Sequence, residues 1–124
     1  MEKYDNMNDL QNRLFNFGAE VLKYLKGLPN TPENRIIRDQ LGRSATSPGA
    51  SYEEAQAGCS PADFHNKINI CLKEMRESNY WLRMLNAVNG TDSDLGFFIA
   101  ESGELMKILG SISAKTQNHR KIKS

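Results

Sequence analysis

The chain has 124 residues, a size that fits one domain burying about two thirds of the surface that its unfolded form exposes. Its formal net charge of +1, with charged residues at 25% of the chain, gives no strong field of either sign. Composition therefore demands neither a polyanionic partner nor a membrane. The apolar runs are short and no secretory signal pattern occurs, so we expect a cytoplasmic protein without membrane contact.

The two cysteines, Cys59 and Cys71, do not have the spacing of a zinc site or of a redox motif. In a cytoplasmic protein we expect both to be reduced thiols. Cys71 also falls on an apolar helical stripe, which predicts a core position. The cysteines therefore indicate neither a metal nor a disulfide.

Apolar residues recur at alternating steps of four and three near the start of the chain, which predicts a first helix over about residues 8–28. This stripe consists of Leu10, Leu14, Phe17, Val21, Tyr24 and Leu28. A second stripe lies beside it and consists of Phe15, Gly18, Leu22 and Leu25. Two adjacent stripes predict that this helix contacts more than one neighbour.

Thr31 and Pro32 predict that a second helix begins near residue 32, because threonine is a good N-cap and proline is tolerated at the first helical position. The helix carries Ile37 and Leu41 inward and is predicted to continue to Gly58. Between residues 40 and 55 its sequence becomes small and polar, and it includes a proline that would break an isolated helix.

Ser60 and Pro61 repeat this start signal and predict a third helix, which ends where Asn89 and Gly90 favour a left-handed cap. Its stripe is the most regular in the chain and consists of Phe64, Ile68, Cys71, Met75, Ser78, Leu82 and Leu85. A fourth helix is predicted to run to about residue 117. Its stripe consists of Leu95, Phe98, Ser102, Leu105, Leu109 and Ile112.

No segment shows the alternation of a half-buried strand, and the connections are short, so neighbouring helices should run antiparallel. The predicted fold is all-α, an up-down-up-down antiparallel four-helix bundle. It should form a single domain over residues 1–118. Residues 119–124 are predicted to be a basic flexible tail.

A polar stripe runs along the second helix beside the apolar one, and two interpretations of it remain open. In the first, small side chains let helices approach closely while Pro48 bends the helix. In the second, the stripe joins charged residues of the third helix in an internal network, because buried charge must be paired. The predicted internal polar cluster consists of Arg43, Ser47, Glu54 and Glu74. If its charged members faced solvent unpaired, the segment would instead be a binding surface.

The second helix contains Gln40-Leu41, Arg43-Ser44-Ala45-Thr46-Ser47, Ala50-Ser51 and Glu54-Ala55, followed by Asp63-Phe64. The third contains Lys73-Glu74, Glu77-Ser78 and Tyr80-Trp81. These motifs, within about residues 14–88, resemble the four-helix bundle proteins first noticed in intervening sequences of bacterial 23S ribosomal RNA genes. The resemblance implies a homopentamer with no established catalytic activity. The accessory variability determinants of diversity-generating retroelements, basic pentamers that bind nucleic acid, are a related group, but the near-neutral charge here is closer to the broader family.

An enzyme is not predicted. A two-metal site in a bundle needs Glu-x-x-His pairs, which are absent because Ala62 and Thr116 stand three residues before His65 and His119. No nucleophile motif or phosphate loop accompanies the carboxylates. We therefore expect no catalytic residue, no metal, no cofactor and no small-molecule substrate.

The predicted function is that of a self-assembling interaction or scaffold protein. Tyr80, Trp81 and Phe97 add large side chains that a small bundle has difficulty hiding, and exposed apolar patches mark interfaces. The alternative is an RNA-binding or DNA-binding protein that gathers weak basic patches by oligomerisation. The basic residues for that role are Arg35, Arg38, Arg43, Lys67, Lys73 and Arg76.

Overall fold

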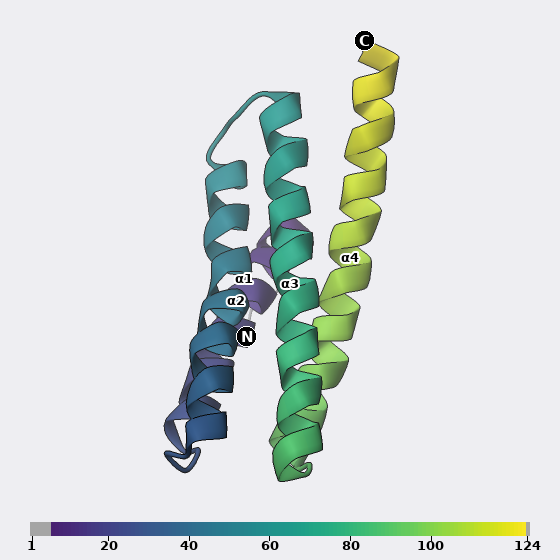
Figure 1. Cartoon of the computed structure of the whole chain (residues 1–124). Helices are drawn as coiled ribbons and strands as arrows, with labels where there is room; N and C mark the ends of the chain where they lie inside the picture. The colour runs from purple at the N-terminus through teal and green to yellow at the C-terminus, as the bar shows by residue number, and fades with distance from the viewer. Residues whose placement is uncertain (1–5, 124) are drawn as a thin grey trace.

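The fold is a bundle of four α-helices (Figure 1). Helix α1 spans Asn6–Lys26, α2 spans Pro32–Gln56, α3 spans Pro61–Asn89 and α4 spans Ser93–Lys123. The structure is a computed structural model that describes residues 6–123, with side chains described over residues 9–117. Within this range there is no β-strand and successive helices run in opposite directions, so the predicted all-α up-down-up-down bundle is confirmed.

The helix boundaries agree with the predicted ones to within a few residues, except at the end of α4. This helix continues to Lys123 instead of ending near residue 117. The basic flexible tail was predicted over residues 119–124, whose side chains lie outside those the structure describes. The tail and the domain boundary at residue 118 therefore stay predictions.

Helix α3 packs along both α2 and α4, whereas α1 packs mainly on α2 and meets α4 less extensively (Figure 1). One ion pair joins α1 to α4, because Arg13 donates hydrogen bonds of 3.0 and 2.8 Å to the two carboxylate oxygens of Glu101. Nearer the α3–α4 connection, the ring of Phe98 packs edge-on against Phe17 and Tyr24. The contact between α1 and α4 is thus built from a few specific side chains.

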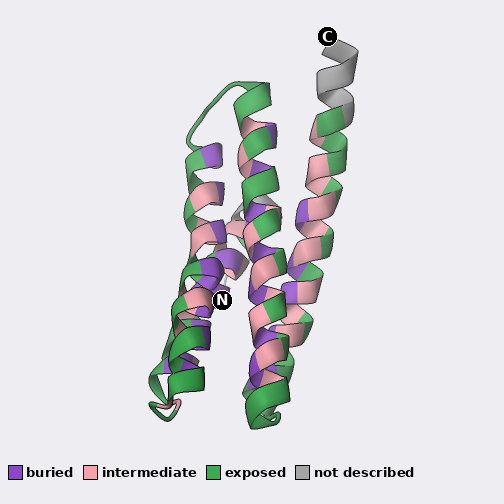
Figure 2. Ribbon diagram, in the orientation of Figure 1, coloured by how far each residue is buried: buried purple, intermediate pink, exposed green. Residues whose placement is uncertain are grey.

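Buried residues face the inside of the bundle and exposed residues its outside (Figure 2). The predicted stripe of α3 is buried apart from the half-buried Phe64, and the first stripe of α1 is buried from Leu10 to Val21. The second stripe of α1 is different, because Phe15 and Leu22 remain exposed. Phe15 and Leu22 are therefore available to a partner outside the single chain, whereas Gly18 and Leu25 of the same stripe are buried.

The predicted helix starts are confirmed by their hydrogen bonds. The Thr31 hydroxyl accepts from the Asn34 N–H at 3.1 Å, and the Ser60 hydroxyl accepts from the Asp63 N–H at 3.1 Å. Gly90, which follows α3, has a φ of +83°, a backbone conformation that favours glycine. Local sequence signals therefore set the starts of α2 and α3 and the end of α3.

Asp92 caps α4, a role that the sequence analysis did not assign. Its carboxylate accepts one hydrogen bond from the Leu95 N–H at 2.8 Å and another from the Tyr24 hydroxyl at 2.8 Å. The backbone bond first, and then the Tyr24 bond, lower the pKa of Asp92 from its ordinary value. Burial and the bond to Asp92 raise the pKa of Tyr24 to about 12. One carboxylate thus ties the start of α4 to α1.

Replacing Asp92 by alanine is expected to lower Tm at neutral pH. Replacing it by asparagine, an equally good N-cap, should preserve most of the stabilisation that the cap provides. Because the folded pKa is lowered, the stabilisation is present above the ordinary aspartate value of 3.8 and is lost as the pH falls through the folded value. The Tm difference between wild type and Asp92→Ala should therefore shrink in acid. Circular dichroism melts at about pH 7 and about pH 2 measure it. An equal difference at both pH values would contradict the prediction.

Candidate functional site

Helix α1 lies close against α2 where Gly18 of α1 faces the small residue Ala45 of α2. A Cβ atom added to Gly18 would stand 3.0 Å from the carbonyl oxygen of Ala45, which is tighter than side chains normally approach a backbone. A Cβ atom added to Gly49 would stand 3.5 Å from the backbone of Leu14, an ordinary contact. These distances favour the first interpretation of the polar stripe, in which small side chains serve close helix packing.

Pro48 lies inside α2 and is fully buried against α3. The Cys71 thiol donates to the carbonyl oxygen of Pro48 at 3.3 Å. One turn away, the Ser78 hydroxyl donates to the Ser44 hydroxyl at 3.1 Å. These two buried polar contacts between α2 and α3 are therefore made by uncharged groups, a thiol with a backbone carbonyl and two hydroxyls.

The four residues predicted to form an internal polar cluster, Arg43, Ser47, Glu54 and Glu74, do not come together. The Arg43 and Glu54 side chains are exposed, and Ser47 and Glu74 are half-buried. One carboxylate oxygen of Glu74 is buried and has no hydrogen-bond partner among the described residues. The prediction fails because positions 43 and 54 turn toward solvent, where a charge avoids the cost of desolvation.

Arg43 and Glu54 find their partners on α3. The Arg43 guanidinium lies 3.8 Å from the Glu77 carboxylate, and the Glu54 carboxylate lies 3.6 Å from the Lys67 ammonium. Exposed ion pairs of this kind contribute at most about 1 kcal/mol. Both residues face solvent but are paired, so the condition for an unpaired binding surface is not met at these two positions.

A polar network around His65, which the sequence pattern does not reveal, joins α3 to the C-terminal part of α4. The buried His65 ring lies 2.6 Å from the Thr116 hydroxyl through Nδ1 and 3.1 Å from the Asn69 amide through Nε2. The Ser113 hydroxyl donates to Asn69 at 2.5 Å. Both ring nitrogens have partners, which is typical of a structural histidine. Only the fold reveals that residues 65 and 116 are neighbours.

Most of the basic residues predicted for nucleic-acid binding are engaged within the chain. Arg38 donates to the carbonyl oxygens of Leu25 and Leu28 and so fixes the α1–α2 connection. Arg35 donates to Asn30 at 3.3 Å. The partners of Arg43 and Lys67 are the α3 and α2 carboxylates described above.

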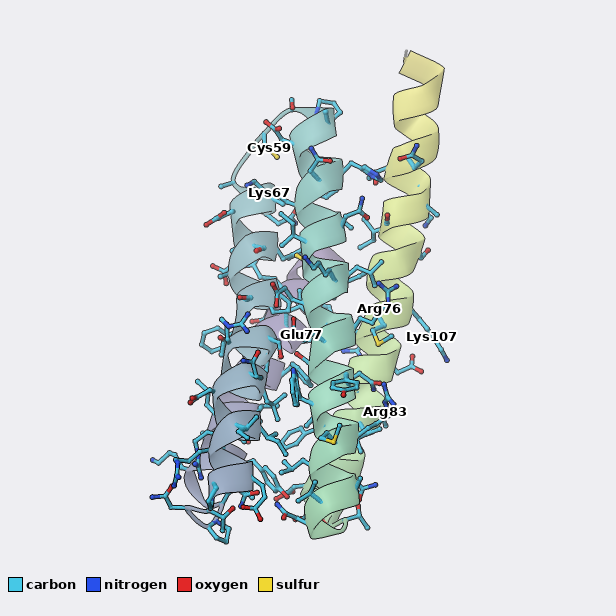
Figure 3. All side chains as sticks on the ribbon, in the orientation of Figure 1. Cys59, Lys67, Arg76, Glu77, Arg83 and Lys107 are labelled. Carbon is cyan, nitrogen blue, oxygen red and sulfur yellow. The ribbon has the colours of Figure 1, made fainter. Side chains whose placement is uncertain are left out.

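The remaining two candidates, Lys73 and Arg76, are exposed, and neither has an ion pair or hydrogen bond among the described side chains. Both lie on the outer side of α3, where the Arg83 guanidinium stands 5.8 Å from the centre of the Tyr80 ring. Figure 3 shows Arg76 and Arg83 on the α4 side of α3, opposite Lys67 and Glu77. Two of the six predicted cations are therefore free on one surface.

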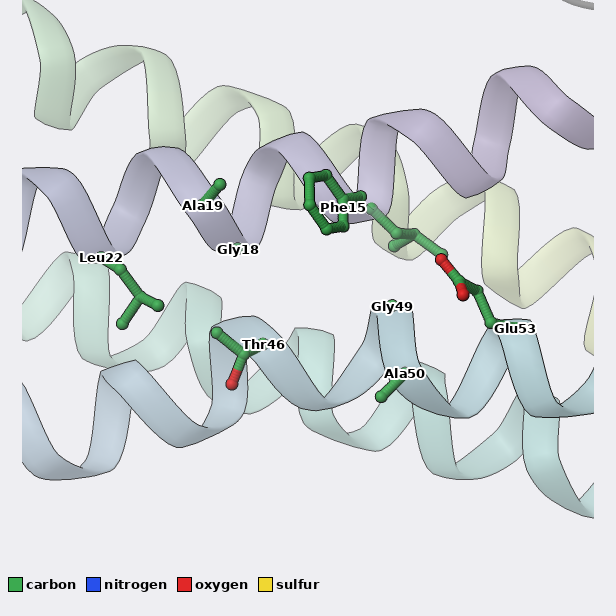
Figure 4. Close-up of a pocket in the computed structure, with 9 residues that line it drawn as sticks. Phe15, Gly18, Ala19, Leu22, Thr46, Gly49, Ala50 and Glu53 are labelled. Carbon is green, nitrogen blue, oxygen red and sulfur yellow. The ribbon is translucent and has the colours of Figure 1, made fainter.

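An open apolar groove lies between α1 and α2 (Figure 4). We call it the α1–α2 groove; its volume is about 400 Å³ and it is lined by Leu14, Phe15, Gly18, Ala19, Leu22, Thr46, Gly49, Ala50 and Glu53. Phe15 is 64% exposed and Leu22 is 45% exposed. Glu53 is the charged residue of the lining, and its carboxylate has no partner among the described side chains. The second stripe of α1 and the small residues of α2 thus build one candidate interaction site.

Over the described residues, no group of histidine, cysteine, aspartate and glutamate side chains is placed to hold a metal ion. None of the described helices has the length and apolar character needed to cross a membrane.

The two thiols are expected to differ sharply in reactivity. Cys59 is exposed and Cys71 is buried, and burial raises the pKa of Cys71 from 9.0 to about 12. A thiol reagent at about pH 8 should therefore titrate one cysteine per native chain and both after denaturation. Because the folded pKa of Cys71 is raised, its contribution to stability is intact below the ordinary value and is lost as the pH rises toward about 12. Rapid modification of Cys71 in the native protein would contradict the burial.

The chain is similar to known proteins of one family. Residues 7–111 match the family described as 23S rRNA-intervening sequence protein. A solved structure from Bacteroides thetaiotaomicron, described as a protein with unknown function from the S23 ribosomal protein family, is 33% identical to this chain. The match covers 87% of this chain and 97% of that chain, with a TM-score of 0.78. No curated protein matches the chain at a significant level. The resemblance of the α2 and α3 motifs is thereby confirmed, and the chain belongs to the family of 23S rRNA-intervening sequence proteins.

Proposed function

We propose that the protein is a non-catalytic, self-assembling scaffold or interaction protein, and that it forms a homo-oligomer, a pentamer by family resemblance. The observation that carries this proposal is the α1–α2 groove with Phe15 and Leu22 exposed along it. Single exposed apolar residues are common, but two that flank one apolar groove are typical of an interface. Covering them in an assembly would stabilise it by about 25 cal/mol for each Å² of apolar surface removed from water.

The placement of the side chains that could do chemistry supports a binding role. His65 is held by Thr116 and Asn69, and the exposed Glu54 is paired with Lys67. The groove presents a single carboxylate, Glu53, and its one hydroxyl, Thr46, donates to the backbone of its own helix. Acid–base or nucleophilic catalysis needs several such groups to converge, so this arrangement favours binding.

The molar mass in solution tests self-assembly. Light scattering coupled to size-exclusion chromatography at micromolar concentration should return a multiple of the chain mass of 14.0 kDa. Dilution should lower the mass only below the dissociation constant. A monomer mass across the micromolar range would overturn the proposal.

Nucleic-acid binding is a second candidate, favoured by the free Lys73 and Arg76 beside Arg83 and Tyr80. A ring of copies would repeat these cations, and phosphate affinity grows with the number of charges presented together. Filter binding of RNA and DNA at low salt tests this function. Retention that Lys73→Glu abolishes without changing the molar mass would support it, and absence of retention by the assembled wild type would exclude it.

A further inference from the structure

We propose that the α1–α2 groove is filled by the outer face of α3 from a second copy of the chain, with Glu53 paired to Lys73 of that copy. We define this outer face of α3 as Ile70, Lys73, Arg76 and Tyr80. The inference rests on the proposed self-assembly and names the two surfaces that meet. Because the surfaces differ, each copy offers both, and the contact is head-to-tail.

Charge complementarity is the first argument for this occupant. The groove carries Glu53, an exposed carboxylate without a partner among the described side chains. The outer face of α3 carries Lys73 and Arg76, exposed cations that are likewise unpaired within the described part of the chain. Complementary charges fix the register of an interface and exclude wrong pairings. A groove facing another groove would bring together two Glu53 carboxylates, with no cation among the residues that line either groove.

Apolar complementarity is the second argument. The outer face of α3 exposes Ile70 at 48% and Tyr80 at 44%, on the same side of the helix as Lys73. The groove offers an apolar floor around Gly18 and Gly49 between exposed Phe15 and Leu22 (Figure 4). Tyrosine beside arginine or lysine is a frequent centre of an interface, since the ring buries a large area at a small entropic cost.

The spacing of the two surfaces also agrees. Lys73 and Tyr80 are seven residues apart, about 10.5 Å along a helix at a rise of 1.5 Å per residue. Glu53 and Thr46 have the same separation along α2, and Thr46 lies at the end of the groove that Leu22 borders (Figure 4). If Lys73 sits on Glu53, an antiparallel α3 places Tyr80 over Thr46 and Leu22. One ion pair and one aromatic contact then anchor opposite ends of the groove.

Two surface substitutions test the two halves of the contact. Phe15→Arg blocks the groove and repels the cations, whereas Tyr80→Asp removes the aromatic anchor and puts a charge against the apolar end of the groove at Leu22. Each should reduce the mass of the assembly to that of a monomer while leaving the circular dichroism spectrum unchanged. Ile36→Asp, at a residue of α2 that is 62% exposed and outside both surfaces, is the matched control and should assemble like wild type.

Mixing the two blocked variants gives the sharpest result. Phe15→Arg retains an intact α3 face and Tyr80→Asp retains an intact groove, so a 1:1 mixture should form a dimer of twice the chain mass and nothing larger. A mixture that stays monomeric would overturn the head-to-tail contact. The charge pair is tested separately: Glu53→Lys and Lys73→Glu should each weaken assembly by about tenfold or more, because like charges then face each other, and the two together in one chain should restore it.

The remaining outcomes separate this inference from the proposed function. A wild type that is monomeric overturns self-assembly, and the contact with it. A wild type that assembles while both blocked variants also assemble overturns the contact alone. Loss of assembly in Phe15→Arg but not in Tyr80→Asp indicates a groove-to-groove dimer and overturns the α3 partner. Unchanged mass with loss of RNA retention in Lys73→Glu assigns the α3 face to nucleic acid and overturns the inference.

Discussion

Replacing Leu82 by alanine is expected to lower the free energy of unfolding by about 2–5 kcal/mol, because the substitution leaves a cavity in the core. Leu82 is fully buried in the C-terminal half of α3, the helix that packs on both α2 and α4. A loss of this size is a large part of the roughly 5–15 kcal/mol by which single domains are stable. Urea denaturation followed by circular dichroism measures it, at a protein concentration where variant and wild type have the same molar mass.

Ile36→Ala is the matched control for this substitution. Ile36 is also a large aliphatic residue within a helix, but 62% of it is exposed, so its truncation should change the free energy of unfolding by no more than about 0.5 kcal/mol. Similar losses in the two variants would mean that α3 does not carry the core as the structure describes.

Leu82 also illustrates what could be predicted from the sequence. The stripe to which it belongs recurs every three or four residues, and such a pattern depends only on the geometry of one helix. Thr31 and Ser60 bind backbone N–H groups three residues away, so their roles as helix caps are equally local. These features needed no knowledge of how the helices are placed relative to one another.

The features that the sequence did not predict join residues that are far apart in the chain. Asp92 binds Tyr24 across 68 positions, and His65 binds Thr116 across 51. The predicted polar cluster failed for a related reason. Periodicity places Arg43 and Glu54 on stripes of α2, but whether a stripe faces the core or solvent depends on how the neighbouring helices pack against it. The rotation of α2 about its own axis is set by its contacts with α1 and α3.

The same reasoning explains why the second stripe of α1 was predicted only in part. Periodicity correctly placed Phe15, Gly18 and Leu22 on one side of the helix. A helix with two apolar stripes predicts two neighbours, and within the described chain the second stripe meets α2 at Gly18 but leaves Phe15 and Leu22 exposed. The proposed assembly would supply a second neighbour from another copy of the chain, which no single-chain pattern can locate.

The closeness of α1 and α2 gives a second prediction with a large effect. Gly18→Ala is expected to destabilise the protein, because its Cβ would stand 3.0 Å from the backbone oxygen of Ala45, and a helical backbone cannot move aside locally. Overpacking of this kind costs about 1–3 kcal/mol, which exceeds the roughly 0.5–1 kcal/mol that alanine gains over glycine inside a helix. Denaturant unfolding should show a net loss.

Gly49→Ala is the control, since the same substitution is made on the facing helix of the same groove. Its Cβ would stand 3.5 Å from the backbone of Leu14, an ordinary contact, so the helix propensity of alanine should appear as a gain of about 0.5–1 kcal/mol. The two variants should thus move in opposite directions and differ by about 1–3 kcal/mol. Equal changes would mean that α1 and α2 do not approach most closely at Gly18.

Because Gly18 sets how deeply α1 sits against α2, Gly18→Ala should also widen the groove and weaken assembly, whereas Gly49→Ala should leave the molar mass unchanged.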